Sequence, residues 1–173
     1  MDRPLVTRPA TEDDAEDIAR IYNLGIEERM ATFETRPREP AEIRSWVEED
    51  IPVVVVEADD RIVAWAAAHP YRPHRPVYRG VGEFSVYVDP DWRGRGAGRI
   101  ALGTLIERCQ DLGYWKLLAR MLPENEGSLA LARTLGFREV GVYRRHARLD
   151  GAWRDCVIVE RLLGPAGHHQ GKD

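Results

Sequence analysis

The segment that most constrains this chain is residues 83–113, where a strand-like pattern leads into a glycine-rich stretch and then into a helix-like pattern. Phe84, Val86 and Val88 alternate with polar or bulkier residues, which is the period of a strand with one buried face. Apolar residues then recur at helical spacing over residues 102–112, and Gly113 supplies a C-terminal stop signal. Residues 93–98 are therefore predicted to form a glycine-rich turn between a strand and a helix.

Such a turn is suited to phosphate groups. Glycine lets backbone N–H groups converge without interference from a Cβ, and the start of the following helix adds positive potential. The spacing of the glycines differs from the G-x-G-x-x-G of dinucleotide folds, and no Lys-Ser/Thr pair follows as in a P-loop. The residues alone leave two interpretations: a solvated glycine-rich turn, or a pyrophosphate-binding turn with Arg95 and Arg99 offering charge to further phosphates.

Length and composition indicate one ordinary globular domain. The chain has 173 residues, 43% hydrophobic and 31% charged, and we expect a single domain over residues 1–163 and a disordered tail over residues 164–173. The net charge of −4 argues against nucleic-acid binding. No apolar run approaches the ~18 residues of a membrane span, and the N-terminus lacks a signal-peptide layout. We therefore expect a cytoplasmic protein. Cys109 and Cys156 fall within predicted elements, so we expect small buried residues rather than a disulfide, and no metal site.

The hydrophobic patterns predict the order β-α-α-β-β-β-α-β-α-β-β. Helices are expected to begin near Thr11, near Pro40, after Gly98 and at Asn125. Strands are expected at residues 5–8, 53–56, 62–69, 84–88 and 115–121, followed by a hairpin over residues 137–149 and 153–162. The third strand is rich in alanine, which is unfavourable strand composition. Prolines and glycines between Pro70 and Gly82 predict a long loop, and long loops favour a functional role.

The turn carries a family resemblance. Arg93-x-x-Gly96-x-Gly98 resembles, position by position, the R/Q-x-x-G-x-G/A signature that binds the coenzyme A pyrophosphate in the GNAT superfamily of N-acyltransferases. Further motifs are similar to the phosphinothricin N-acetyltransferase group, which includes acetylases of methionine sulfoximine and of related arsenic-containing amino acids. They are Thr32-Phe33-Glu34-Thr35-Arg36-Pro37, Glu83-x-Ser85-Val86-Tyr87-Val88, Leu122-Pro123-x-Asn125-x-x-Ser128, Leu135-Gly136-Phe137 and Gly151-x-Trp153-x-Asp155.

The resemblance covers nearly the whole chain up to Leu163 and implies a fold and partners. The fold would be an α/β (α+β) GNAT fold, with a mixed, mostly antiparallel sheet of about seven strands flanked by about four helices. Acetyl-CoA would be the co-substrate, with no metal, and the protein would be a homodimer.

The resemblance also implies which residues bind the coenzyme. The central strand would pair with the pantetheine arm and offer an N–H to the thioester oxygen, and Asn125 would bond the arm. The structural alternatives are plain sheet pairing of the strand and helix capping by Asn125 or Ser128. The residues concerned are Val86, Tyr87, Val88, Arg93, Gly94, Arg95, Gly96, Ala97, Gly98, Arg99, Asn125 and Ser128.

Glu83 is the predicted general base. A free α-amino group is mostly protonated at neutral pH and must lose a proton before it attacks a thioester. Glu83 opens the central strand, no competing acid precedes it in the loop, and the resemblance implies a catalytic glutamate here. The alternative is a structural glutamate paired with Arg79.

One position departs from the family pattern. Related enzymes have a tyrosine or histidine four residues after Ser128, proposed to protonate the leaving thiolate, and this chain has Ala132. Water, or a hydroxyl such as that of Tyr143, would have to serve instead.

The basic loop before Glu83 predicts an anionic acceptor, because arginine binds carboxylate or phosphinate oxygens through paired N–H donors. Any one of these arginines could instead be a solvated loop charge. The resemblance places substrate contacts in this loop, and we expect them from Phe33, Arg72, Arg75, Val77, Tyr78 and Arg79.

The expected function is acetyl-CoA-dependent N-acetylation of a small anionic amino-acid analogue of the phosphinothricin, methionine sulfoximine, methionine sulfone or arsinothricin type, which would be a detoxification activity. One alternative is a protein N-terminal or polyamine acetyltransferase, whose cationic acceptors would favour an acidic pocket. Another is a non-catalytic acyl-CoA-binding module, which would keep the turn and lose Glu83.

Overall fold

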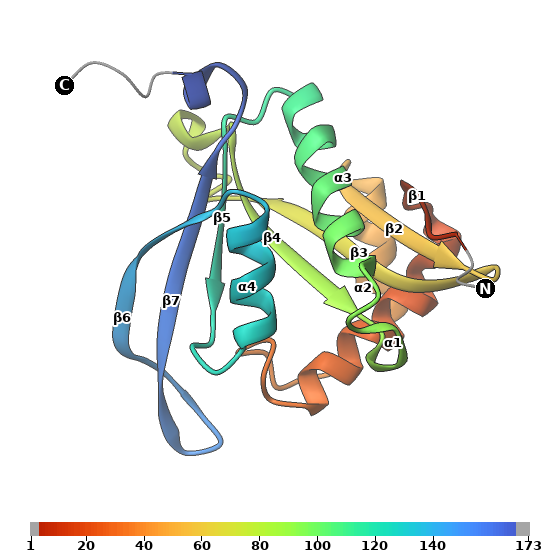
Figure 1. Cartoon of the computed structure of the whole chain (residues 1–173), viewed down its shortest axis with the longest axis horizontal. Helices are drawn as coiled ribbons and strands as arrows, with labels where there is room; N and C mark the ends of the chain where they lie inside the picture. Colours follow the sequence, from red (N-terminus) through yellow and green to blue (C-terminus); the bar gives the residue numbers. More distant parts are fainter. Residues whose placement is uncertain (1–3, 169–173) are drawn as a thin grey trace.

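The alternating segments become seven strands of one mixed sheet in the computed structural model, which describes residues 4–168 (Figure 1). The strand order is β1-β2-β3-β4-β5-β7-β6, and every neighbouring pair is antiparallel except β4 and β5. The strands are β1 (Val6–Pro9), β2 (Val53–Ala58), β3 (Arg61–Pro70), β4 (Val81–Val88), β5 (Lys116–Met121), β6 (Arg138–Leu149) and β7 (Ala152–Leu162).

Four helices cover the two faces of this sheet, so the expected fold class is confirmed. Helices α1 (Ala15–Glu27) and α2 (Pro40–Glu48) pack on one face. Helices α3 (Ala97–Asp111) and α4 (Glu126–Thr134) pack on the other (Figure 1). The β6–β7 hairpin extends beyond the helices, and β6 is exposed along almost its whole length.

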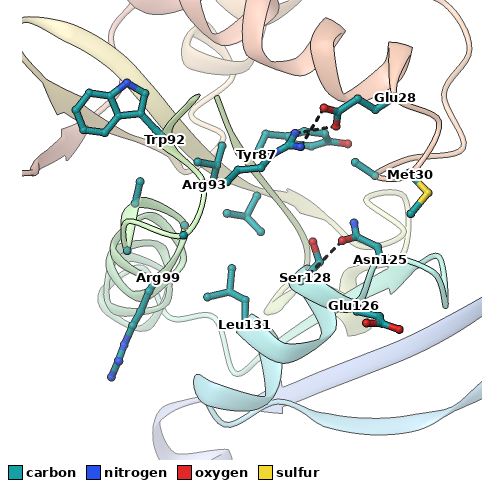
Figure 2. Close-up of a pocket in the computed structure, with 18 of the residues that line it drawn as sticks. Glu28, Met30, Tyr87, Trp92, Arg93, Arg99, Asn125, Glu126, Ser128 and Leu131 are labelled. Carbon is teal, nitrogen blue, oxygen red and sulfur yellow. Dashed lines mark hydrogen bonds and ion pairs between the residues drawn. The ribbon is translucent and has the colours of Figure 1, made fainter. Parts of the chain in front are cut away.

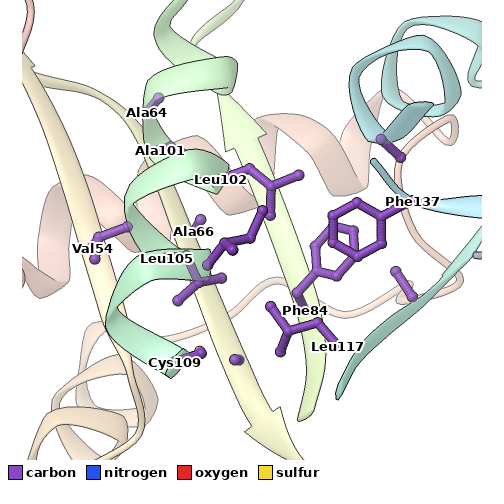
Figure 3. Packing of buried hydrophobic residues seen from close by; sticks show 14 of the residues in the cluster. Val54, Ala64, Ala66, Phe84, Ala101, Leu102, Leu105, Cys109, Leu117 and Phe137 are labelled. Carbon is purple, nitrogen blue, oxygen red and sulfur yellow. The ribbon is translucent and has the colours of Figure 1, made fainter. Parts of the chain in front are cut away.

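The alanine-rich strand β3 is explained by its place beneath α3. Ala64, Ala66 and Ala68 are fully buried on the α3 face, where small side chains let the helix lie close to the sheet. Leu102 and Leu105 of α3 fill the space above them and reach Phe84 (Figure 3). Burial on both faces outweighs the weak intrinsic strand preference of alanine.

The opposite face of the sheet has an aromatic core. Trp65 of β3 stacks on Tyr87 of β4 with ring centroids 4.8 Å apart, and Tyr22 of α1 lies against both rings. Gly25 permits this approach, because a Cβ there would lie 2.7 Å from the Tyr87 ring. The alternation read from the sequence therefore holds along β4, with Phe84 on one face and Tyr87 on the other.

Strands β4 and β5 separate after a short parallel contact, and this separation positions the functional site. Their pairing extends only from Val81 opposite Lys116 to Glu83 opposite Leu118. On its other edge, β4 pairs with β3 along its whole length. Within the described chain, residues 84–88 therefore have a free edge on the β5 side.

The C-terminal expectation was partly wrong. Gly164–His168 form a short 3-10 helix instead of a disordered tail, while residues 169–173 lie outside the described chain. Cys109 and Cys156 are buried free thiols, as predicted. Over residues 4–168, no helix is long and apolar enough to cross a membrane, and no three acidic, histidine or cysteine side chains gather as metal ligands.

Candidate active site

The predicted turn joins β4 to α3, and each of its glycines has a structural reason. Gly94 and Gly96 have φ of 73° and 87°, in the left-handed region that favours glycine, and Gly96 is the N-cap of α3. A Cβ on Gly98 would lie 3.1 Å from Val88 and 3.3 Å from Leu131, so this glycine allows the helix to approach β4 and α4. The turn therefore holds the start of α3 against the free edge of β4.

A groove of about 820 Å³ lies between β4, the start of α3 and the start of α4 (Figure 2). Eleven of the twelve predicted coenzyme residues line it, and Arg95 does not. In the described residues, none of the amides of residues 94–99 donates a turn or cap hydrogen bond. These free donors at a helix start fit a pyrophosphate, and the free edge of β4 fits an extended pantetheine arm.

The arginines of the turn have different surroundings. Arg93 makes a two-pronged ion pair with Glu28 at the end of α1, with N–O distances of 2.9 and 2.7 Å (Figure 2). Arg95 lies over the Trp92 ring at 5.0 Å and does not line the groove, so its contact with the coenzyme stays a prediction. Arg99 lines the groove and makes no ion pair within the described chain, which leaves its charge available to phosphate.

Asn125 and Ser128 both line the groove at the start of α4. The Oδ1 of Asn125 accepts a hydrogen bond from the Ser128 amide at 3.2 Å, so the capping role weighed from the sequence is present (Figure 2). Its Nδ2 has no hydrogen-bond partner in the described chain and remains a donor toward the groove.

The sequence reasoning missed further residues that line the groove and have no local sequence signal of their own. They are Glu28, Met30, Ala31, Trp92, Glu124, Glu126, Gly127 and Leu131.

A second cavity of about 270 Å³ lies on the α1–α2 face of the sheet, beside Glu83. Its walls are aromatic and polar, formed by Tyr22, Glu34, Arg38, Trp46, Trp65, His69, Glu83 and Ser85. Ser85 lines this cavity and Val86 lines the groove, so consecutive residues of β4 take part in both spaces.

Glu83 is held by a residue that sequence reasoning missed. Both Nε and Nη2 of Arg120, on β5, lie 2.7 Å from Oε1 of Glu83. The alternative considered from the sequence, a pairing of Glu83 with Arg79, is not present, because the Arg79 guanidinium lies over the Trp115 ring at 5.9 Å. The other carboxylate oxygen, Oε2, has no hydrogen bond within the described chain and can accept a proton. The contact between Arg120 and Glu83 could be predicted only from the parallel register of β4 and β5.

His69 lies directly opposite Glu83 in the β3–β4 pair and packs edge-on against Trp46 at 4.7 Å. Burial lowers the pKa of His69 by more than the nearby Glu83 charge raises it, so the ring is neutral at pH 7. Burial also raises the pKa of Tyr22 and of Tyr87, which keeps both phenols neutral. The acidic side chains that line this cavity are Glu34 and Glu83.

The basic loop lines neither space, so the structure does not bring the expected substrate contacts together and they stay predictions. Arg72, Arg75, Val77 and Arg79 are exposed, and Tyr78 and Phe33 are half-buried; none of the six lines the groove or the cavity. The loop arginines instead stack on aromatic rings, for example Arg72 at 5.4 Å from Tyr71 and Arg75 at 5.8 Å from Tyr78. Aromatic residues interleaved in the loop thus account for much of its local structure.

Neither residue considered for protonating the leaving thiolate, Ala132 or Tyr143, can do so from its place in the structure. Ala132 is fully buried in the core and offers no proton. Tyr143 lies 54% exposed on β6 against His146 and does not line the groove. A hydroxyl from Tyr143 therefore does not reach the groove within one chain, and water is the remaining proton donor of the two considered.

Comparison with known proteins agrees with this geometry. Residues 18–137 match the model of the family described as "Acetyltransferase (GNAT) family". The chain is 35% identical to the phosphinothricin N-acetyltransferase of Alcaligenes faecalis, over 90% of this chain and 81% of that one. It is 30% identical to an L-methionine sulfoximine/L-methionine sulfone acetyltransferase of Pseudomonas paraeruginosa, over 91% of this chain and 94% of that one.

Solved structures extend the likeness to three dimensions. The phosphinothricin acetyltransferase of Sinorhizobium meliloti, solved in complex with acetyl-CoA, superposes with a TM-score of 0.87 at 29% identity, covering 98% of this chain and 94% of that one. A ribosomal-protein-alanine N-acetyltransferase from Brucella melitensis gives 0.86 at 31% identity, covering 91% and 99%. The splayed β4 edge, the glycine turn and the groove are thus those of an N-acetyltransferase, and the chain belongs to the GNAT family of acetyltransferases.

Proposed function

We propose that this enzyme transfers the acetyl group of acetyl-CoA to the α-amino group of a small amino-acid analogue, of the phosphinothricin, methionine sulfoximine, methionine sulfone or arsinothricin type. The observation that carries the proposal is the junction of two spaces along β4. A long groove with free backbone donors ends beside a small cavity, and Glu83 stands in the wall of that cavity. The names of the similar proteins support this substrate class.

In this proposal the coenzyme lies along the groove. The amides of the glycine turn and the Arg99 guanidinium bind its phosphates, and the free edge of residues 86–88 binds the pantetheine arm. The arm brings the thioester to the end of the groove next to Ser85. An N–H of β4 donates to the thioester oxygen, where negative charge develops as the amine attacks.

Glu83 is the proposed base. The ammonium proton of the acceptor passes to Oε2, directly or through one water, while Arg120 keeps Oε1 in place. The amine nitrogen then forms a bond to the thioester carbon, the nitrogen gives up its second proton to water, and the carbon–sulfur bond breaks. Water protonates the departing sulfur, which a thiol with an ordinary pKa of ~8.5 permits.

A screen of thiol release from acetyl-CoA tests the proposal. The acceptors are phosphinothricin, methionine sulfoximine, methionine sulfone, arsinothricin, a polyamine and a peptide with an N-terminal alanine. We expect turnover with the amino-acid analogues and little with the other two. Preferential turnover of the peptide would favour a protein N-terminal acetyltransferase, a class to which the Brucella melitensis protein's name belongs.

We also propose that the enzyme is a homodimer, as its family resemblance implies. The exposed hairpin carries apolar and aromatic side chains suited to a protein interface, among them Val140, Val142, Tyr143 and Trp153. Sedimentation at micromolar concentration should give twice the chain mass of 19.7 kDa. A monomer at that concentration would contradict this part of the proposal.

A further inference from the structure

The small cavity beside Glu83 contains a cation that the mechanism above does not use. Arg38 is the single arginine or lysine among the described residues that line it. It lies in the segment between α1 and α2, far from the basic loop in sequence. The charges facing the cavity are therefore one guanidinium and two carboxylates, those of Glu34 and Glu83.

Arg38 is held in place by its backbone. The side chain of Asn23 on α1 accepts a hydrogen bond from the Arg38 amide at 2.7 Å and donates one to the Arg38 carbonyl at 3.0 Å. The guanidinium lies 5.7 Å from the centre of the Tyr22 ring. A cation fixed at a cavity in this way is preorganised for a ligand, because little further order is required on binding.

The protein alone leaves donors around this cavity unsatisfied. Arg38 Nη2 pairs with Glu34 at 2.9 Å and Nη1 with Glu42 at 3.2 Å, but Arg38 Nε is buried without a partner. The indole N–H of Trp65, in the same cavity wall, is also buried without a partner. Two of the three buried side-chain groups without a partner in the described chain thus belong to residues that line this cavity.

The charges are arranged for a zwitterion. The Glu83 carboxylate and the Arg38 guanidinium line the same small cavity. An α-amino acid presents an ammonium group and a carboxylate close together. With its ammonium at Glu83, its carboxylate can face Arg38, whose side chain remains 23% exposed.

From this arrangement we propose that Arg38 binds the carboxylate of the acceptor, and that the cavity selects α-amino acids whose side chains carry no second anionic group. The inference rests on the proposed function and narrows it. A second anion would meet no further cation in the described cavity wall, whereas the rings of Trp46 and Trp65 suit an uncharged side chain. Methionine sulfone fits this description better than phosphinothricin.

A double-mutant cycle between enzyme and substrate tests the role of Arg38. Wild type and Arg38→Met are each assayed with methionine sulfone and with its carboxamide, which lacks the carboxylate charge. Removing either partner of a charged hydrogen bond should lower kcat/KM on the order of 10- to 100-fold, and removing the second should add little. Arg44→Met, which removes an exposed arginine of α2, is the matched control and should change neither substrate.

The outcomes separate this inference from the proposed function. Equal kcat/KM for acid and amide in the wild-type enzyme would overturn the role of Arg38 while leaving the acetyltransferase function intact, and this comparison needs no variant to fold. A carboxylate-dependent loss in Arg75→Met but not in Arg38→Met would return recognition to the loop. A preference for phosphinothricin over methionine sulfone would overturn the proposed selection against a second anionic group. No turnover of any amino acid would reject the proposed function itself.

Discussion

Replacing Glu83 by glutamine separates proton acceptance from positioning, because Arg120 binds only one of its two oxygens. The Arg120 donors both lie 2.7 Å from Oε1, and a glutamine carbonyl can accept the same bonds. The substitution therefore preserves the side-chain orientation and replaces Oε2 by an amide group that cannot take a proton.

The expected effect is a loss of kcat with little change in coenzyme binding. A positioned general base contributes ~10²–10⁴-fold, which corresponds to about 2.7–5.5 kcal/mol in the activation free energy. Since Glu83 lines the small cavity and not the groove, the KM for acetyl-CoA should stay within about twofold.

Thiol release should be followed with a saturating amino-acid acceptor from about pH 7 to about pH 10. The variant should recover part of its rate at high pH, because the amine then arrives deprotonated and the missing step matters less. Glu139→Gln is a matched control. Glu139 lies on the exposed strand β6, pairs with Arg133 of α4 and lines neither the groove nor the cavity.

Near-normal kcat of Glu83→Gln at pH 7 would refute the role of Glu83 as a base. A large loss without recovery at high pH would mean instead that Glu83 orients Arg120 and the acceptor. The two results are distinguishable in one pH series.

Two further predictions follow from the fold. Gly96→Val places a branched side chain at a φ of 87°, in space where no protein atom lies within 4 Å of the added Cβ. The KM for acetyl-CoA should therefore rise by about tenfold or more, whereas the control Gly103→Ala within α3 should leave it unchanged. An unchanged KM in a folded Gly96→Val enzyme would remove the turn from the coenzyme site. Burial alone would raise the pKa of Asp14, but hydrogen bonds from Arg8 and Thr11 outweigh it and leave that pKa below its ordinary value. The stabilisation from the Arg8–Asp14 ion pair should be full at neutral pH and lost as the pH falls below about 4. Asp14→Asn should therefore lower the free energy of unfolding in urea by ~1.5–3 kcal/mol at pH 7 and by less at pH 3. Equal losses at the two pH values would contradict this prediction.

The fold and the coenzyme turn could be predicted because their signals are local. Strand alternation, helix spacing and turn residues act over a few positions, so the element order could be predicted from them. The mixed sheet was predicted from the family resemblance. The left-handed glycines lie just before α3. Their spacing predicted a turn, and the family resemblance was needed to interpret that turn as a coenzyme site. What the local pattern of β3 could not show was its burial on both faces, which made alanine a suitable strand residue.

The residues around Glu83 could not be predicted in the same way, because they come from distant segments. Arg120 reaches Glu83 only through the parallel register of β4 and β5, and Arg38 reaches the cavity only because Asn23 fixes the segment between α1 and α2. Neither relation leaves a trace in the neighbouring sequence. The prediction of Glu83 itself came from a family resemblance and its position at the start of a strand.

The clustered arginines of the loop lie apart from the cavity beside Glu83, whose one lining arginine among the described residues is Arg38. The loop arginines are numerous, but their guanidinium groups lie on tyrosine and tryptophan rings at the surface, where water already solvates the charge. Arg38 is isolated in the sequence, yet it stands beside buried, unsatisfied donors in a small cavity with aromatic walls. A charged hydrogen bond is worth more where water is excluded, so one fixed guanidinium at a cavity can discriminate an acceptor better than several exposed ones.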